Sequence, residues 1–268
     1  MIKNFQLKER IDLDRLKRMT ATAKRRRDFD GDDDRAAHEA DIKKLHTLKK
    51  QASKTGRYTV EYTLRSCGRY YPGAPGLPRV GLASLPRKYR KPLCCGFDTD
   101  VDIENAHPSL ISQIFKEQGL KCKTLDDYVA NRGKFLEVVD KTQWTALLNN
   151  RIPKESSSDL EKEYWNDIIS SALKLFELPW YNTYFEKGKK QNPNNPIGWA
   201  ISQLATDKER ETVSHAMMYL KGLGYKISTL IHDGFLVQDL NVKEDHLLDI
   251  VIIKLLKKLM ILKKEIKI

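Results

Sequence analysis

The stretch YKISTLIHDGFLVQ at residues 225–238 decides the fold, because it consists of two apolar runs around a short polar turn. The runs, residues 225–231 and 235–238, flank a His-Asp-Gly segment. Short apolar runs on either side of Asp-Gly are typical of a tight β-hairpin. The sequence therefore predicts a hairpin that presents Asp233 at its tip.

A second acidic signal lies earlier in the chain, in FDTDVDIENAHPSL at residues 97–110. Residues 97–103 are expected to form a short strand, and residues 105–118 a helix with Pro108 in its first turn, where proline is tolerated. Asp102 then stands where the strand ends. Two carboxylates presented from neighbouring strands can hold a pair of Mg²⁺ ions for an in-line displacement at phosphorus.

Three aspartates in this strand, Asp98, Asp100 and Asp102, alternate with period two and are expected on one face. One interpretation has Asp100 assist the metal site. The favoured one has Asp98 solvated and only Asp102 reaching the metals, because clustered carboxylates repel one another. Asn105 is either a group near the metals or an N-cap of the following helix, and Glu104 is a further candidate near them.

The overall charge points to an anionic partner. Of 268 residues, 48 are Lys or Arg and 36 are Asp or Glu, a formal net charge of +12. A basic chain typically meets nucleic acid or an anionic membrane face. The composition excludes collagen-like, wholly disordered and disulfide-scaffold classes.

Cysteine usage and apolar runs bear on the compartment. Four cysteines without a CxxC pair or a histidine at zinc spacing argue against a zinc site and for a reducing compartment. The N-terminus lacks the apolar core of a signal peptide, and lysines interrupt the apolar run near the C-terminus. We expect an intracellular protein, cytoplasmic or nuclear, neither secreted nor membrane-bound.

Two basic regions precede the first acidic signal. Residues 1–60 contain 17 basic and 10 acidic side chains, including the run KRRR at residues 24–27, and residues 1–56 are expected to be helical. This region is either an arm that holds phosphates or a solvated, salt-bridged helix pair. Residues 68–93 have the composition of an ordered loop. They interleave tyrosines with cations, among them Arg69, Arg79, Arg87 and Arg90, a mixture that suits phosphates and stacked bases.

The remaining segments are mainly helical by pattern. Residues 125–190 and 197–223 are expected to form helices, separated by a turn cluster at residues 191–196. The pattern of residues 243–268 predicts an amphipathic helix that either lies on a membrane surface or, in the favoured interpretation, packs against a sheet. Four tryptophans are expected in the core: Trp144, Trp165, Trp180 and Trp199. The Cys94-Cys95 pair is expected to pack within a strand.

Several of these signals occur in an order that resembles a known family. GRYY at residues 68–71, the Asp102 strand, a lysine-bearing helix near Lys141 and the IHDG hairpin are similar to the ordered motifs of family A DNA polymerases and single-subunit phage-type RNA polymerases. The likeness spans about residues 60–240. It is greatest to the small, divergent family A-like polymerases of transposons, virophages and phages.

The resemblance implies roles for the acidic and adjacent residues. Asp102 and Asp233 would be the metal ligands, and His232 would orient the primer end. Arg69 would contact the primer–template minor groove, as would Gln203 from a later helix. Arg87 and Arg90 are further candidates for contacts with nucleic acid.

The resemblance also implies a nucleotide site. Lys141 would contact the incoming triphosphate, with Arg132, Lys134 and Arg151 as rival phosphate ligands. His107 stands where family A DNA polymerases have the glutamate that excludes a 2′-hydroxyl. Two positions depart from the family pattern: Asn149 replaces a tyrosine and Glu137 replaces an arginine.

The expected fold is α+β: a right-hand palm whose antiparallel sheet carries Asp102 and the Asp233 hairpin. Residues 1–60 would form a reduced, thumb-like helical region. Residues 61–268 would form the palm, with helical fingers inserted at about 112–200.

The expected function is template-directed nucleotidyl transfer by a DNA polymerase or primase-polymerase, with two Mg²⁺ ions (or Mn²⁺) and release of pyrophosphate. The partners considered are a DNA primer–template, nucleoside triphosphates, and a helicase or other replication protein. The alternatives are a single-subunit RNA polymerase and a decayed polymerase fold that only binds nucleic acid. Retention of Asp102 and Asp233 speaks against decay, whereas the departures at Asn149 and Glu137 speak for it.

Overall fold

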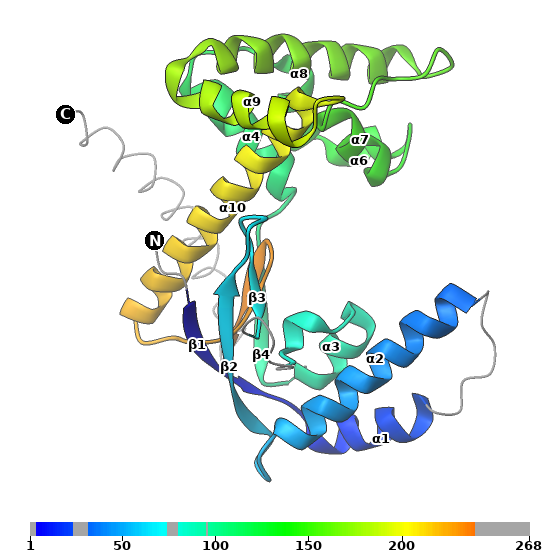
Figure 1. The fold of residues 1–268 in the computed structure, drawn as a ribbon, viewed down its shortest axis with the longest axis vertical. Coiled ribbons are helices and arrows are strands. Elements are labelled where there is room, and N and C mark those ends of the chain that lie inside the picture. The colour runs from blue at the N-terminus through cyan, green and yellow to red at the C-terminus, as the bar shows by residue number, and fades with distance from the viewer. Residues whose placement is uncertain (1–3, 24–31, 74–79, 95, 239–268) are drawn as a thin grey trace. The chain divides into compact units, whose positions relative to one another are not determined.

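The computed structural model describes residues 4–23, 32–73, 80–94 and 96–238. The predictions for the KRRR run, Arg79, Cys95 and the helix at residues 243–268 lie outside these ranges. The fold is α+β, with helices and two small antiparallel sheets (Figure 1). The chain divides into two compact units. Unit 1 contains the described residues up to Asp102 and from Thr212 onward, and unit 2 is Ile103–Glu211.

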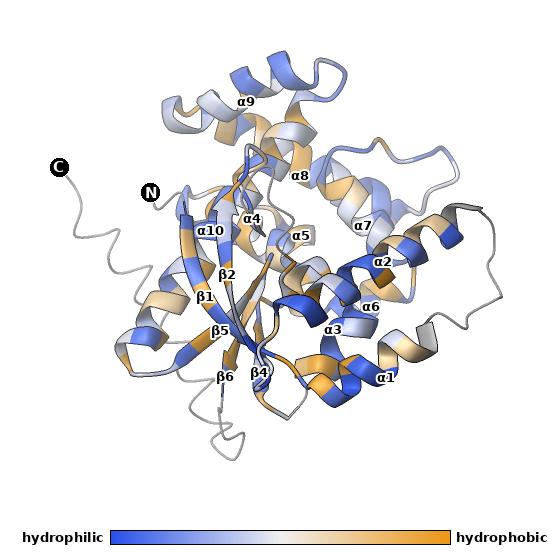
Figure 2. Ribbon diagram, turned by 60° about the horizontal axis from the view of Figure 1, so that its bottom comes forward, coloured by the Kyte–Doolittle hydropathy of each residue, from blue (hydrophilic) through white to orange (hydrophobic). Residues whose placement is uncertain are grey.

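The first sheet of unit 1 has the order β1-β2-β3, all antiparallel. Its strands are β1 (Asn4–Arg10), β2 (Arg57–Leu64) and β3 (Tyr70–Pro72). The expectation of helix throughout residues 1–56 is therefore wrong for β1. Hydrophilic and hydrophobic residues alternate in the first part of this strand, whereas its last three residues are all hydrophilic (Figure 2). Its buried side chains, Leu7 and Glu9, lie two residues apart. That spacing places them on one face of a strand.

The second sheet of unit 1 has the order β4-β6-β5 and confirms the predicted strand and hairpin. Its strands are β4 (Asp98–Asp102), β5 (Lys226–Ile231) and β6 (Gly234–Gln238). Phe235, Leu236 and Val237 are all buried, so this central strand contributes side chains to both faces of the sheet. Continuous burial explains why residues 235–237 of β6 are all apolar rather than alternating with polar residues.

A buried carboxylate network joins the two sheets. Glu9 of β1 is fully buried and accepts hydrogen bonds from the hydroxyls of Tyr58 and Tyr62 and from the backbone N–H of Leu82. The Tyr62 hydroxyl in turn accepts a hydrogen bond from the backbone N–H of Leu230 in β5, at 3.3 Å. Burial raises the pKa of Glu9 above 4.5, although these hydrogen bonds oppose the shift.

The helices of unit 1 are α1 (Leu13–Ala23), α2 (Asp32–Gln51), the 3₁₀ turn η1 (Leu82–Ser84), α3 (Arg87–Cys94) and the end of α10 (Pro196–Gly222). Helices α1 and α2 confirm the helical expectation for that part of the N-terminal region. Helix α3 corrects the prediction of a loop, because Pro86 starts a helix rather than breaking one: its carbonyl accepts from the N–H groups of Tyr89 and Arg90. Cys94 is buried at the end of α3, so its assignment to a strand is wrong.

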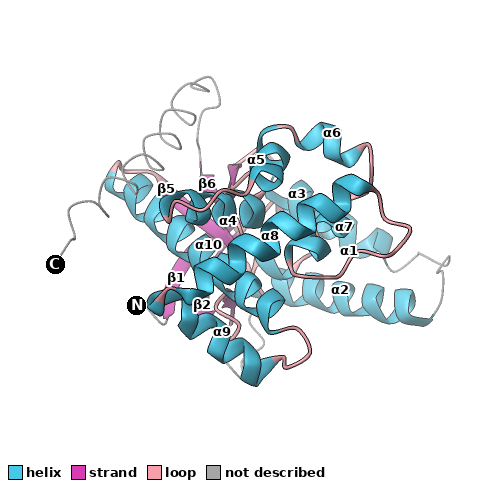
Figure 3. Ribbon diagram, turned by 90° about the horizontal axis from the view of Figure 1, so that it is seen from above, coloured by secondary structure: helices cyan, strands magenta, loops and turns pink. Residues whose placement is uncertain are grey.

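Every regular element of unit 2 is a helix (Figure 3). The helices are α4 (Ala106–Glu117), α5 (Lys123–Ala130), α6 (Arg132–Leu136), α7 (Lys141–Leu148), α8 (Asp159–Glu177), α9 (Pro179–Gln191) and the first part of α10 (Pro196–Gly222). This pattern agrees with the helices expected from the sequence. No described helix is long and apolar enough to span a membrane.

An aromatic cluster forms the centre of unit 2. Trp144 is fully buried, and its ring lies 5.0 Å from that of Tyr164 and 5.2 Å from that of Phe135, between ring centroids. Trp165 packs against this core and Trp199 is half-buried. The prediction is wrong for Trp180, which is 78% exposed, because α9 faces the core with Tyr181 instead.

Candidate catalytic site and nucleic-acid interface

The two predicted catalytic aspartates lie at the same end of the second sheet. In the β4–β6 pair Asp102 is opposite Gly234, and in the β5–β6 pair Gly234 is opposite Ile231. The turn therefore consists of His232 and Asp233 alone. Neighbouring strands are about 4.8 Å apart. The register thus places Asp233 one residue from the position paired with Asp102.

Gly234 permits this close approach of the hairpin to β4. A Cβ atom at this position would clash with the carbonyl oxygen of Val101 and would lie 2.9 Å from the Cα of Asp102. Any larger residue would push β6 away from β4. The glycine after Asp233 is therefore required by the packing between the strands that carry the two aspartates.

The other aspartates of β4 lie further from the turn. Asp98 is opposite Gln238 at the far end of the strand pair, and its Oδ2 accepts from Ser228 Oγ at 2.9 Å. Asp100 is exposed and opposite Leu236. Asp102 is thus the member of the triplet that lies beside the His232-Asp233 turn.

The GRYY element lies against this turn. The ring of Tyr71 in β3 contacts the ring of His232, with 5.3 Å between centroids and 61° between planes. The loop before β3 closes through hydrogen bonds between Arg65 and both Gly68 and Arg69, and Gly68 has φ +86°, which favours glycine. Three separated sequence signals, GRYY, Asp102 and His232-Asp233, therefore meet in unit 1.

Helix α3 presents the other predicted nucleic-acid contacts of unit 1. Arg87 is exposed. Arg90 is half-buried, and its Nη1 donates to the carbonyl of Leu85 at 3.4 Å. Lys88 lies over the ring of Tyr89, 5.0 Å from its centroid. The cations and tyrosines that alternate in the sequence thus include a local cation–π contact on this helix, between Lys88 and Tyr89.

In unit 2, His107 is paired with a buried acid that the sequence reasoning missed. His107 Nε2 lies 3.2 Å from Oε2 of Glu209, whose side chain is 2% exposed. His107 belongs to α4 and Glu209 to α10. A pair so far apart in sequence leaves no local signal.

The predicted nucleotide ligands of unit 2 lie on α6 and α7. Lys134 and Lys141 are exposed, and Lys141 is the first residue of α7, after the N-cap Asp140. Arg132 is half-buried and lies near Tyr128. Asn149, where the resemblance leads one to expect a tyrosine, is the C-cap of α7, and its carbonyl accepts from Asn195 Nδ2 at 3.0 Å.

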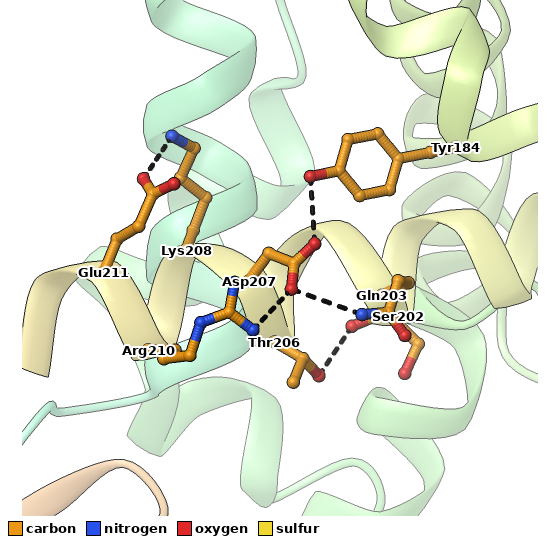
Figure 4. A network of polar contacts seen from close by, with 8 residues as sticks. All are labelled: Tyr184, Ser202, Gln203, Thr206, Asp207, Lys208, Arg210 and Glu211. Atoms are coloured by element: carbon orange, nitrogen blue, oxygen red, sulfur yellow. Dashed lines mark hydrogen bonds and ion pairs between the residues drawn. The ribbon is translucent and has the colours of Figure 1, made fainter. Parts of the chain in front are cut away.

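Gln203 belongs to a polar network on α10 (Figure 4). Its Nε2 donates to Asp207 Oδ1 at 3.3 Å, and the same oxygen accepts from Arg210 Nη1 at 2.8 Å. Tyr184 of α9 donates to Oδ2 of Asp207 at 3.0 Å. Asp207 therefore holds the Gln203 amide and fixes α9 to α10.

The donors beside the turn suit a magnesium ion in number and type. Among the described residues no group of three or more His, Cys, Asp or Glu side chains has the arrangement of a metal site. Mg²⁺ commonly uses one or two protein carboxylates and takes water and substrate phosphates as its other ligands. Asp102 and Asp233, one exposed and one half-buried, fit that donor set.

Comparison with known proteins identifies a distant relative. No family model matches the chain. The chain is 26% identical over 183 residues to a Sputnik virophage protein named "Putative helicase V13", and the match covers 60% of the chain. The chain spans only 23% of the length of that protein, so the similarity is to one part of a much larger polypeptide.

Proposed function

We propose that the chain is a template-directed nucleotidyltransferase, a DNA polymerase or primase-polymerase, whose second sheet is a polymerase palm. The observation that carries the proposal is the strand register, which brings Asp102 and Asp233 to one end of an antiparallel sheet. The contact between Tyr71 and His232 supports it, because it adds the glycine-arginine element to the same end of unit 1.

In this proposal Asp102 and Asp233 bind Mg²⁺, and His232 orients the primer end beside them. When bound, the metal ions would supply the charge that activates a 3′-hydroxyl and stabilises departing pyrophosphate. Arg69 and Arg87 neutralise backbone phosphates, and Lys134 and Lys141 bind the triphosphate. The reacting phosphates and the two carboxylates are all anionic. Such cations would offset the repulsion between them.

The virophage relative supports a role in replication. The name of that protein describes a helicase, an enzyme class that acts on nucleic acid, and the chain matches less than a quarter of its length. We therefore propose that this chain acts together with a helicase. The helicase is either another part of a longer polypeptide or a separate partner protein. The net charge of +12 agrees with a nucleic-acid substrate.

Primer extension tests the proposal. The assay uses the full chain, a labelled primer on a DNA template, Mg²⁺ or Mn²⁺, and dNTPs or NTPs, with and without primer. Wild type should extend, and Asp233→Asn and Asp102→Asn should each lose at least about 10²–10³-fold in rate, the scale of removing one group that stabilises transition-state charge. The sugar and primer dependence then separates a DNA polymerase from a primase and from an RNA polymerase.

Asp100→Asn is the matched control, since Asp100 is exposed on the same strand two residues from Asp102. It should extend nearly as well as wild type. Equal extension by wild type and Asp233→Asn, or no extension by wild type under any condition, would overturn the proposal. Retained salt-sensitive DNA binding in the second case would favour a binding module on a polymerase fold.

A further inference from the structure

An exposed tryptophan marks a surface of unit 2 that the catalytic proposal does not use. Trp180, the second residue of α9, is 78% exposed, and its neighbour Leu178 is 37% exposed. Tryptophan is among the residues that proteins bury most on average. A single exposed apolar residue is common on protein surfaces, so only the residues that lie beside Trp180 can mark a binding surface.

The opposite face of α9 is firmly held, so the exposure of Trp180 does not come from a loosely packed helix. Tyr181 is buried, and the rings of Phe185 and Phe176 stack at 5.8 Å between centroids with 5° between their planes. Gly188 lies so close to the carbonyl of Pro196 that a Cβ atom would clash with it. The orientation of α9 is fixed by these contacts together with the Tyr184–Asp207 hydrogen bond.

Two lysines share the helical stripe of Trp180. At 100° per residue, Lys187 lies about 20° around the helix from Trp180 and Lys190 about 80° from it, on the exposed half of α9. No ion pair joins either lysine to another residue in the described part of the chain. Lys189, by contrast, lies on the other side of the helix and is paired with Glu186 at 2.6 Å.

We infer that the stripe formed by Trp180, Lys187 and Lys190 binds single-stranded nucleic acid, with a base stacked on the Trp180 indole and phosphates beside the lysines. An exposed aromatic ring next to unpaired cations is the combination that single-strand binding surfaces use. The stripe is about 15 Å long at 1.5 Å per residue, enough for a few nucleotides. The inference rests on the proposed function for its choice of ligand, because both take nucleic acid as the substrate.

Binding of a fluorescein-labelled oligo(dT) of about 20 nucleotides, in EDTA and without nucleotide, tests this surface apart from catalysis. Trp180→Ala should weaken binding about 5- to 150-fold, the range of one lost base–aromatic stack. Trp180→Phe should restore most of the affinity, and Trp180→Leu should not, because leucine keeps apolar area without a ring. Since Trp180 is largely exposed, all three variants should melt at the wild-type temperature.

The lysines have a matched control within the same helix. The double change Lys187→Gln with Lys190→Gln should lower the slope of log affinity against log salt by about 1.4, since each phosphate contact on a single strand contributes about 0.7. Lys189→Gln should leave the slope unchanged. Oligo(dT) should also quench wild-type tryptophan fluorescence, and Trp180→Phe should lose that quenching.

The outcomes separate this inference from the proposed function. Unchanged oligo(dT) affinity in Trp180→Ala, or full affinity in Trp180→Leu, would overturn the stacking surface even if the chain extends primers, and would redirect it to a protein partner. A chain that extends no primer but loses oligo(dT) affinity in Trp180→Ala would overturn the polymerase proposal and keep the surface.

Discussion

Both units of the molecule bury apolar side chains, but the interactions at their centres differ. Unit 1 joins two small sheets through a buried polar network in which Glu9 accepts from two tyrosine hydroxyls and a backbone N–H. Unit 2 is centred on buried aromatic rings, with Trp144 and Tyr164 5.0 Å apart between centroids. Hydrogen bonds fix direction and register, whereas apolar burial is non-directional.

This difference agrees with the kind of functional residue that each unit holds in place. In unit 1 the placement of Asp102 beside the His232-Asp233 turn depends on strand register, and a shift by one residue would turn each side chain to the other face. In unit 2 the exposed cations and Trp180 stand on helix surfaces that need only a stable interior. We therefore expect variants in the two units to fail in different ways.

The largest effect should come from the aromatic core. Trp144→Ala removes a fully buried ring and the hydrogen bond from Trp144 Nε1 to the carbonyl of Phe135. We expect a loss of about 3–5 kcal/mol in the free energy of unfolding, measured by urea denaturation. Trp180→Ala is the control and should change it by less than about 0.5 kcal/mol. Equal losses would mean that burial does not distinguish these tryptophans.

Gly234→Ala should disturb the second sheet at the point where β6 approaches β4 most closely. The added methyl group meets the backbone of Val101 and Asp102, which cannot move as a side chain could. We expect a loss of about 1–3 kcal/mol in stability, and primer extension at least tenfold slower, a drop of about 1.4 kcal/mol in transition-state stabilisation.

The control for that variant is Gly222→Ala, at the end of α10, where an added Cβ atom would meet nothing within 4 Å. It should be neutral in both stability and extension. Wild-type extension by Gly234→Ala would show that the separation of β4 and β6 is not critical.

The buried network around Glu9 should make the free energy of unfolding depend on pH. The folded pKa of Glu9 is raised by burial, so between the unfolded value of 4.5 and the raised folded value the native state binds more protons. Stability from this group is complete below 4.5 and is lost as pH rises toward the folded pKa. The wild-type minus Glu9→Gln difference in unfolding free energy should therefore increase as pH falls from 7 toward 4.5.

For one proton, this difference in unfolding free energy cannot change by more than about 1.4 kcal/mol per pH unit. Urea denaturation of both proteins at several pH values measures it. A difference that does not vary with pH, or that grows as pH rises, would contradict the raised pKa.

The smallest effect should lie at the start of α8. Ser158 and Glu161 form a capping box in which each side chain accepts from the other's backbone N–H. Ser158→Ala should cost about 1 kcal/mol, measured by thermal unfolding. Ser170→Ala, at an exposed position within the same helix, should be neutral or slightly stabilising. A Ser158→Ala protein as stable as wild type would mean that the cap is replaced by water.

Local patterns predicted the elements beside the turn but not the contacts between distant residues. The hairpin and the Asp102 strand were predictable, because apolar runs and a two-residue turn are local signals. Strand β1 was missed because its inward-facing Glu9 is charged, which conceals the alternation until Tyr58 and Tyr62 are seen to satisfy it.

The remaining errors have the same origin. Trp180 was expected in the core because composition does not reveal which residue of a helix start faces inward, a choice made here by Tyr181. Glu209 was missed because its partner His107 is distant in sequence. The roles proposed for Lys141, Arg132 and Gln203 stay predictions, since their contacts within unit 2 do not show a ligand.

From the pairing of β4 with the β5–β6 hairpin we also expect an order of assembly. Asp98 and Ser228, which are hydrogen-bonded, are 130 residues apart in the chain, and the helices of unit 2 are synthesised between them. Helices with local contacts form quickly, whereas strand pairing over such a separation is slow. Folding of unit 2 shortens the loop that must close and so lowers its entropic cost. Asp102 and Asp233 therefore come together late, and a half-made chain lacks the paired aspartates on which its proposed chemistry depends.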